Sequence, residues 1–198
     1  MLILAAATIS TMPNSPPTPI RREEILRLSH EIRNRFAGAS IDDIARINDV
    51  MLVRSDGPFG KDAGFACINF IEKPVFIESL ARPLEKVRVW GRAEKRPVRS
   101  IVINPNAGIP EREVFWHEYF HLFYSSHSVQ RSERFVHHFS TEGALHYQEE
   151  RRADEFAAAI LIPSIRSSFS IAEIAERFAV SDRLAKCAVR FYRQISEL

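Results

Sequence analysis

The chain has 198 residues, of which 45% are hydrophobic and 26% are charged, and its formal net charge is +2. This composition is typical of a soluble globular protein with a substantial core, and it excludes a disordered tail or a membrane span. The near balance of charge gives no indication of a nucleic-acid or acidic membrane partner.

The first 19 residues are predicted to form a flexible N-terminal arm. They hold an apolar run of about nine residues with no preceding Lys or Arg, and then four prolines between Pro13 and Pro19. Such a run is too short to span a bilayer and makes a poor secretory signal. Cys67 and Cys187 form no disulfide or metal-binding pattern. We therefore expect a cytoplasmic protein with one folded domain over 20–198.

Two amphipathic helices are predicted at the start of this domain. Between residues 21 and 37, apolar residues recur at helical spacing, and Gly38 follows as a C-terminal cap. Ser40 with Asp43 resembles an N-cap with an acidic first turn, which predicts a short second helix through Ile47. Neither helix contains a candidate catalytic residue.

Short β-rich runs separated by Gly, Pro and Asp fill the region from Val50 to Asn104. They predict an antiparallel or mixed sheet of three to five strands. The segment from Lys86 to Arg99 alternates apolar and basic residues around Gly91, which predicts a hairpin with one solvent-exposed basic face.

The next predicted helix follows Pro110 and contains the most informative motif, in which Glu118 lies between His117 and His121. Histidines four residues apart lie on one face of a helix, so both can bind one metal ion. Glu118 would lie beside the metal, where it can take a proton from water and deliver it to a leaving amine. The alternative is a pair of half-buried helix histidines with ordinary hydrogen bonds, and a third ligand decides between the two.

A second helix, predicted from Glu149 to Ile162, supplies that ligand. Glu150 and Asp154 share one face with small alanines, which allow a close approach to the motif helix. Glu150 can therefore complete a His-His-Glu zinc site. Asp154 can accept a hydrogen bond from the outer nitrogen of a ligand histidine. Glu149 is the rival ligand, but the residue four positions after it is an alanine.

Together these segments resemble the ImmA/IrrE metallopeptidases, whose second motif commonly reads E-x-x-A-N-x-F-A-x-x-L-L-x-P. The resemblance covers about Ile101 to Pro163. It implies a minimal gluzincin-like α+β domain in which a small, mostly antiparallel or mixed sheet packs against both motif helices. It also implies zinc bound by His117, His121 and Glu150, with Glu118 as the catalytic base. The implied substrate is a protein, either a helix-turn-helix repressor or an antitoxin-like regulator.

The chain departs from that family pattern at three positions. Trp116 and Phe120 stand where the family has small residues, so the packing around the motif must be built differently. Asp154 replaces the usual asparagine, which strengthens its assignment as the acceptor of a histidine N–H.

Residues 125–147 are predicted to be a polar loop rich in His and Tyr. A peptidase of this kind needs a donor that stabilises the tetrahedral oxyanion. His138 and His146 are the candidates, and the sequence does not separate them.

The last segment, residues 165–198, is predicted to be helical, with caps at Ser170 and Ser181. The spacing of its apolar and capping residues resembles that of a helix-turn-helix. Its second helix carries basic residues but few side chains suited to reading bases. We therefore favour packing within the domain over direct nucleic-acid binding. The alternative function is a metal-containing DNA-binding or protein-binding regulator that cleaves nothing.

Overall fold

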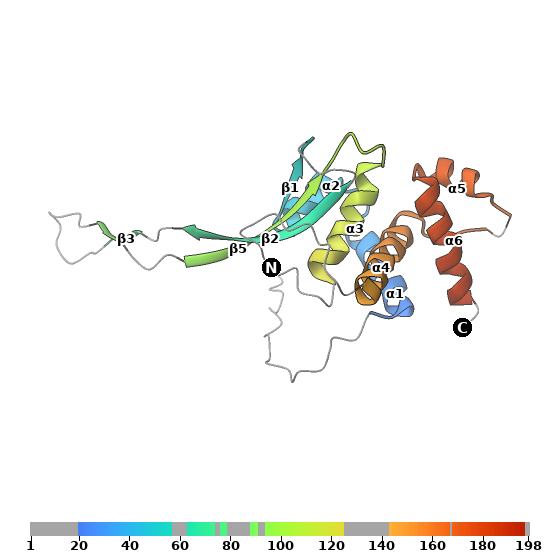
Figure 1. The fold of residues 1–198 in the computed structure, drawn as a ribbon, viewed down its shortest axis with the longest axis horizontal. Coiled ribbons are helices and arrows are strands. Elements are labelled where there is room, and N and C mark those ends of the chain that lie inside the picture. The colour runs from blue at the N-terminus through green and yellow to red at the C-terminus, as the bar shows by residue number, and fades with distance from the viewer. Residues whose placement is uncertain are drawn as a thin grey trace.

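The computed structural model describes residues 20–56, 63–73, 76–78, 88–90, 94–124, 143–166 and 168–196. Over these residues the fold is α+β, with six helices and a three-stranded mixed sheet (Figure 1). The predicted fold class is therefore confirmed at this level. The predicted arm before Ile20 lies outside the described residues. None of the described helices is long and apolar enough to cross a membrane.

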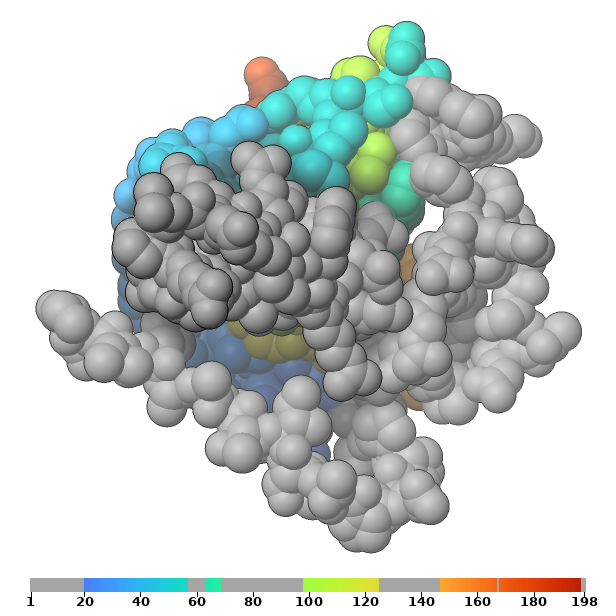
Figure 2. All heavy atoms as spheres, turned by 90° about the vertical axis from the view of Figure 1, so that its left-hand side faces the viewer, coloured from blue at the N-terminus to red at the C-terminus, as the bar shows by residue number. Residues whose placement is uncertain are grey.

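The main sheet has the strand order β1-β5-β2, with β1 at Val50–Arg54, β2 at Gly64–Lys73 and β5 at Glu94–Ile103. The central strand β5 is parallel to β1 and antiparallel to β2. Ile101 and Ile103 of β5 are fully buried, whereas Val102 between them is half-buried. Because residues two apart in a strand share a face, the two isoleucines mark the side of the sheet that faces the core. The early part of the chain, drawn in blue to cyan, lies at the surface of the face seen in Figure 2.

The predicted hairpin over residues 86–99 is wrong. Strand β4, Arg88–Trp90, pairs with β3, Phe76–Glu78, whereas β5 pairs with β2 over ten residues. Pro97 lies in the part of β5 that β1 does not reach, so its missing N–H can face the unpaired side. Alternation of apolar and basic residues marks a strand, but it does not identify the pairing partner.

Helices α1, Arg22–Arg35, and α2, Ile41–Ile47, agree with the two predicted N-terminal helices. The Ser40 side chain accepts a hydrogen bond from the backbone N–H of Asp43, which confirms the predicted cap. Gly38 has a φ of +75°, a conformation that favours glycine in the turn between the two helices.

Helix α3, Glu111–Phe123, lies between the sheet and helix α4, Gly143–Leu161 (Figure 1). Gly64 of β2 permits a close approach to α3, because a Cβ atom there would overlap the Val114 side chain. On the other side of α3, the fully buried Ala153 belongs to the α4 surface that keeps the two helices close.

Helix α4 begins at Gly143, six residues before the predicted start at Glu149. Residues 143–147 are therefore helical and do not belong to a loop. This stretch, with the sequence GALHY, is too short to show a helical repeat of apolar residues, although its residues other than Gly143 tolerate helix well.

Helices α5, Ile171–Phe178, and α6, Asp182–Ser196, form the C-terminal part, and α6 packs against α4 (Figure 1). Ser170 forms the predicted capping box at α5. The first turn of α3 holds the connection between the two helices. Arg112 donates to the carbonyls of Phe178 and Ala179, and the buried Glu113 accepts from the backbone and hydroxyl of Ser181.

Candidate metal centre

Three side chains from α3 and α4 converge at one point. His117 Nε2 lies 3.2 Å from His121 Nε2 and 3.1 Å from Glu150 Oε2. His121 Nε2 lies 3.3 Å from Glu150 Oε1. The histidine side chains are 15% and 14% exposed, whereas Glu150 is 42% exposed, so the glutamate forms the more open side of the group.

The spacing between the nitrogen and oxygen atoms of these side chains suits one metal ion. Two atoms that bind zinc tetrahedrally at about 2.0 Å are about 3.3 Å apart. When His117 is neutral and donates through Nδ1, its Nε2 lone pair faces a carboxylate oxygen and a second imidazole. A cation at this point would satisfy all three groups. His117, His121 and Glu150 together form the ligand group, which can hold a metal ion.

Asp154 orients His117 and is itself held by helix α6. Its Oδ1 atom lies 2.9 Å from His117 Nδ1, which fixes the ring so that Nε2 faces the ligand group. Arg183 Nη1 lies 3.0 Å from Oδ1 and 2.8 Å from Oδ2 of the same carboxylate. Burial opposes ionisation of Asp154, but His117 and Arg183 outweigh it and hold its pKa below the ordinary value.

Glu118 lies beside this group but is not part of it. Burial raises the pKa of Glu118, while the charges of the two histidines act in the opposite direction. The backbone N–H of Ala66 in β2 faces its carboxylate and also acts to lower this pKa. Glu118 therefore lies between the ligand group and β2, as a half-buried carboxylate suited to accepting a proton.

The large residues of the motif lie in the core and not at the ligand group. Trp116 is 5% exposed and Phe120 is 1% exposed. Their rings lie 6.4 Å and 5.4 Å from that of Phe156 in α4. Aromatic packing between α3 and α4 thus takes the place of the small residues expected from the family pattern.

We predict that zinc binding to the metal-free protein releases about one proton near pH 8. Burial lowers the pKa of His117, but the hydrogen bonds that its ring donates to Asp154 and Glu150 outweigh burial and raise this pKa to about 10. Because zinc binds neutral imidazole, that proton must leave, and the zinc affinity should fall about tenfold per pH unit below this pKa. Calorimetry in buffers of different ionisation enthalpy measures the proton count. A count near zero at pH 8 would show that His117 is already neutral.

Neither proposed oxyanion donor can be placed against the ligand group. His138 lies outside the described residues, and the backbone of His146 lies in α4, one turn before Glu150. Conversely, no sequence pattern predicts the contact between Arg183 and Asp154. The two residues are 29 positions apart, and α6 carries several other exposed basic residues.

Comparisons with protein-family models, curated proteins and solved structures gave no match. The following proposal therefore depends on the geometry of this site and on the motif resemblance.

Proposed function

We propose that the chain is a zinc-dependent endopeptidase that cleaves another protein. The observation that carries the proposal is the convergence of His117, His121 and Glu150 on one point with Glu118 beside it. In a metal site that only stabilises the fold, a half-buried carboxylate that does not bind the metal, such as Glu118, has no function. A hydrolase needs such a group as its base.

When bound, zinc supplies a Lewis acid that polarises the scissile carbonyl and lowers the pKa of water. Glu118 accepts a proton as the water attacks the carbonyl carbon, and later gives it to the amine that leaves. Asp154 keeps the His117 ring in the orientation that the site requires. Arg183 limits the movement of Asp154, because it bonds both oxygens of that carboxylate.

Strand β2 is the surface on which an extended peptide would lie. Among the described strands, β2 pairs with β5 on one side and has no strand on the other. The N–H of Ala66 points away from β5, since it faces the carboxylate of Glu118. The N–H of Ile68 points the same way, because residues two apart in a strand share an orientation. A substrate strand added at this edge would therefore pass beside the base.

Replacing Ile68 by proline should lower kcat/KM by about tenfold or more with little change in stability. Proline removes one outward N–H and no bond to β5. Ile68→Ala is the matched control, because it shortens the side chain and keeps the N–H. Steady-state cleavage and thermal unfolding of both variants give the comparison. Equal cleavage by the two variants would show that the substrate does not pair with β2.

The substrate is proposed to be a DNA-binding repressor or an antitoxin-like regulator, as the resemblance to ImmA/IrrE peptidases implies. The test combines metal analysis of the purified protein with a search for new protein N-termini in cells that express it. Zinc near one equivalent, together with N-termini that require Glu118, supports the proposal. A protein that binds no metal and produces no new N-termini would contradict it.

A further inference from the structure

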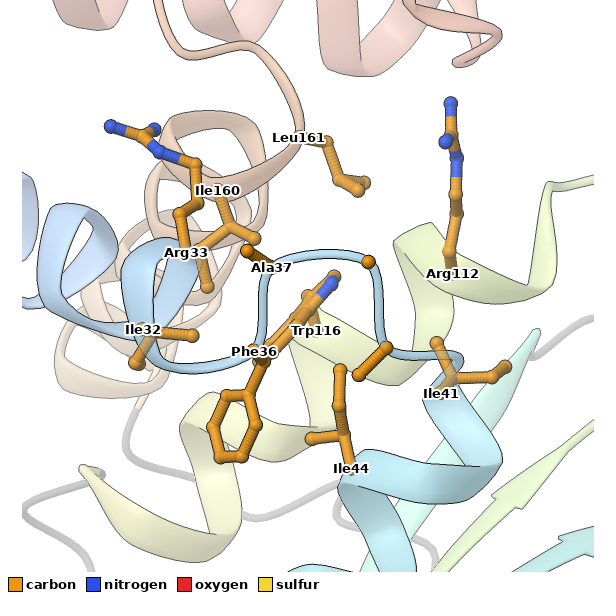
Figure 3. Close-up of a pocket in the computed structure, with 12 residues that line it drawn as sticks. Ile32, Arg33, Phe36, Ala37, Ile41, Ile44, Arg112, Trp116, Ile160 and Leu161 are labelled. Atoms are coloured by element: carbon orange, nitrogen blue, oxygen red, sulfur yellow. The ribbon is translucent and has the colours of Figure 1, made fainter.

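A hollow of about 350 Å³ lies where α1, α2, α3 and α4 meet, and none of the metal-centre residues lines it (Figure 3). Its walls are mainly apolar and include Ile32, Phe36, Ile44, Trp116, Ile160 and Leu161. Small-molecule sites in proteins have this range of volume, with apolar walls and a few polar groups. Polar groups should therefore identify the class of ligand.

The first such group is the indole N–H of Trp116. The side chain is 5% exposed, and its nitrogen points toward the open side of the hollow, below Leu161 (Figure 3). This N–H forms no hydrogen bond with another described residue, and because its nitrogen is not among the buried polar atoms without a partner, solvent reaches it. The indole N–H is therefore an available donor at the hollow, which water or the acceptor group of a ligand can reach.

The other polar groups are two arginines on either side of Leu161 (Figure 3). Arg33 donates to the carbonyl of Ala159, and Arg112 donates to two carbonyls at the end of α5. Both are half-buried, and within the described part of the chain neither pairs with a carboxylate. Half-buried cations without an acidic partner favour a negative group nearby.

We propose that this hollow binds a small amphipathic carboxylate. The apolar body of the ligand packs on Trp116 and Phe36, and its carboxylate accepts the Trp116 N–H. Arg33 and Arg112 add positive charge at the mouth, which favours an anion over a neutral or cationic molecule of the same shape. The hollow and the metal centre share no residue, so neither proposal depends on the other.

Octanoate is the probe, and the full chain with Trp90→Phe is the reporter. Because the sequence has two tryptophans, this variant keeps one indole, that of Trp116. Titration with octanoate should shift the indole N–H resonance to lower field in a saturable way, as a new hydrogen bond to an anion requires. Octylamine, protonated at neutral pH, should bind at least tenfold more weakly.

Ala37 offers a matched pair of variants, because it is exposed and lines the hollow (Figure 3). Ala37→Glu should weaken octanoate binding at least fivefold, whereas Ala37→Lys should leave it unchanged or tighter. Three results would overturn the proposal. They are an absence of saturation, equal binding of octylamine, and equal affinity of the two Ala37 variants. The first would mean that water alone occupies the hollow.

Discussion

Replacing Glu150 by alanine is expected to lower zinc affinity by more than about 100-fold. Loss of a hydrogen-bonding partner behind a ligand commonly costs 10- to 100-fold, and loss of the ligand itself should cost more. Each Glu150 carboxylate oxygen lies near a histidine nitrogen. Among the described residues, no other carboxylate belongs to this group, so none can take the place of Glu150 as a ligand. Competition with a chromophoric chelator gives the affinity, and atomic absorption gives the stoichiometry.

Glu149→Ala is the matched control for this experiment. It removes an equal charge from the neighbouring position of the same helix, so the two variants share any general electrostatic effect. The control should bind zinc within about threefold of the parent, since Glu149 does not belong to the group that can hold the metal. Unchanged zinc affinity in Glu150→Ala would place the third ligand elsewhere, and loss in Glu149→Ala alone would identify the rival residue.

Local sequence signals predicted the parts of this fold that depend on neighbouring residues. Caps at Ser40 and Ser170 were predicted because each cap involves residues three positions apart. The two ligand histidines were placed together for the same reason, since helical spacing alone puts them on one face. The sequence links Glu150 to them across 28 intervening residues through the rarity of the combined motif and not through local physics.

Features that depend on distant packing were not predictable in this way. The partner of β4 is β3, and no turn residue in the sequence distinguishes this pairing from a hairpin with β5. Arg183 holds Asp154 because α6 lies against α4, which capping and spacing do not determine. The hollow beside Trp116 likewise requires four helices to be placed before it exists.

Replacing Glu118 by glutamine is expected to lower cleavage by at least 10²-fold and leave zinc binding intact. The amide keeps the size of the side chain and can still form hydrogen bonds, but it cannot accept the proton of the attacking water. Zinc stoichiometry should remain that of the parent, because the ligand group does not include Glu118. New protein N-termini in cells and zinc content of the purified variant provide the two measurements.

Glu111→Gln provides the control on the same helix. Glu111 lies in the first turn of α3 and pairs with Arg54, away from the ligand group, so cleavage should persist. Retained turnover in Glu118→Gln would exclude Glu118 as the base. If instead parent and variant bind zinc equally and neither yields new N-termini, the metal group belongs to a non-catalytic regulator. Zinc content and new N-termini, measured on this one substitution, therefore test whether Glu118 is the base. They also distinguish a peptidase from a regulator that binds metal without cleaving protein.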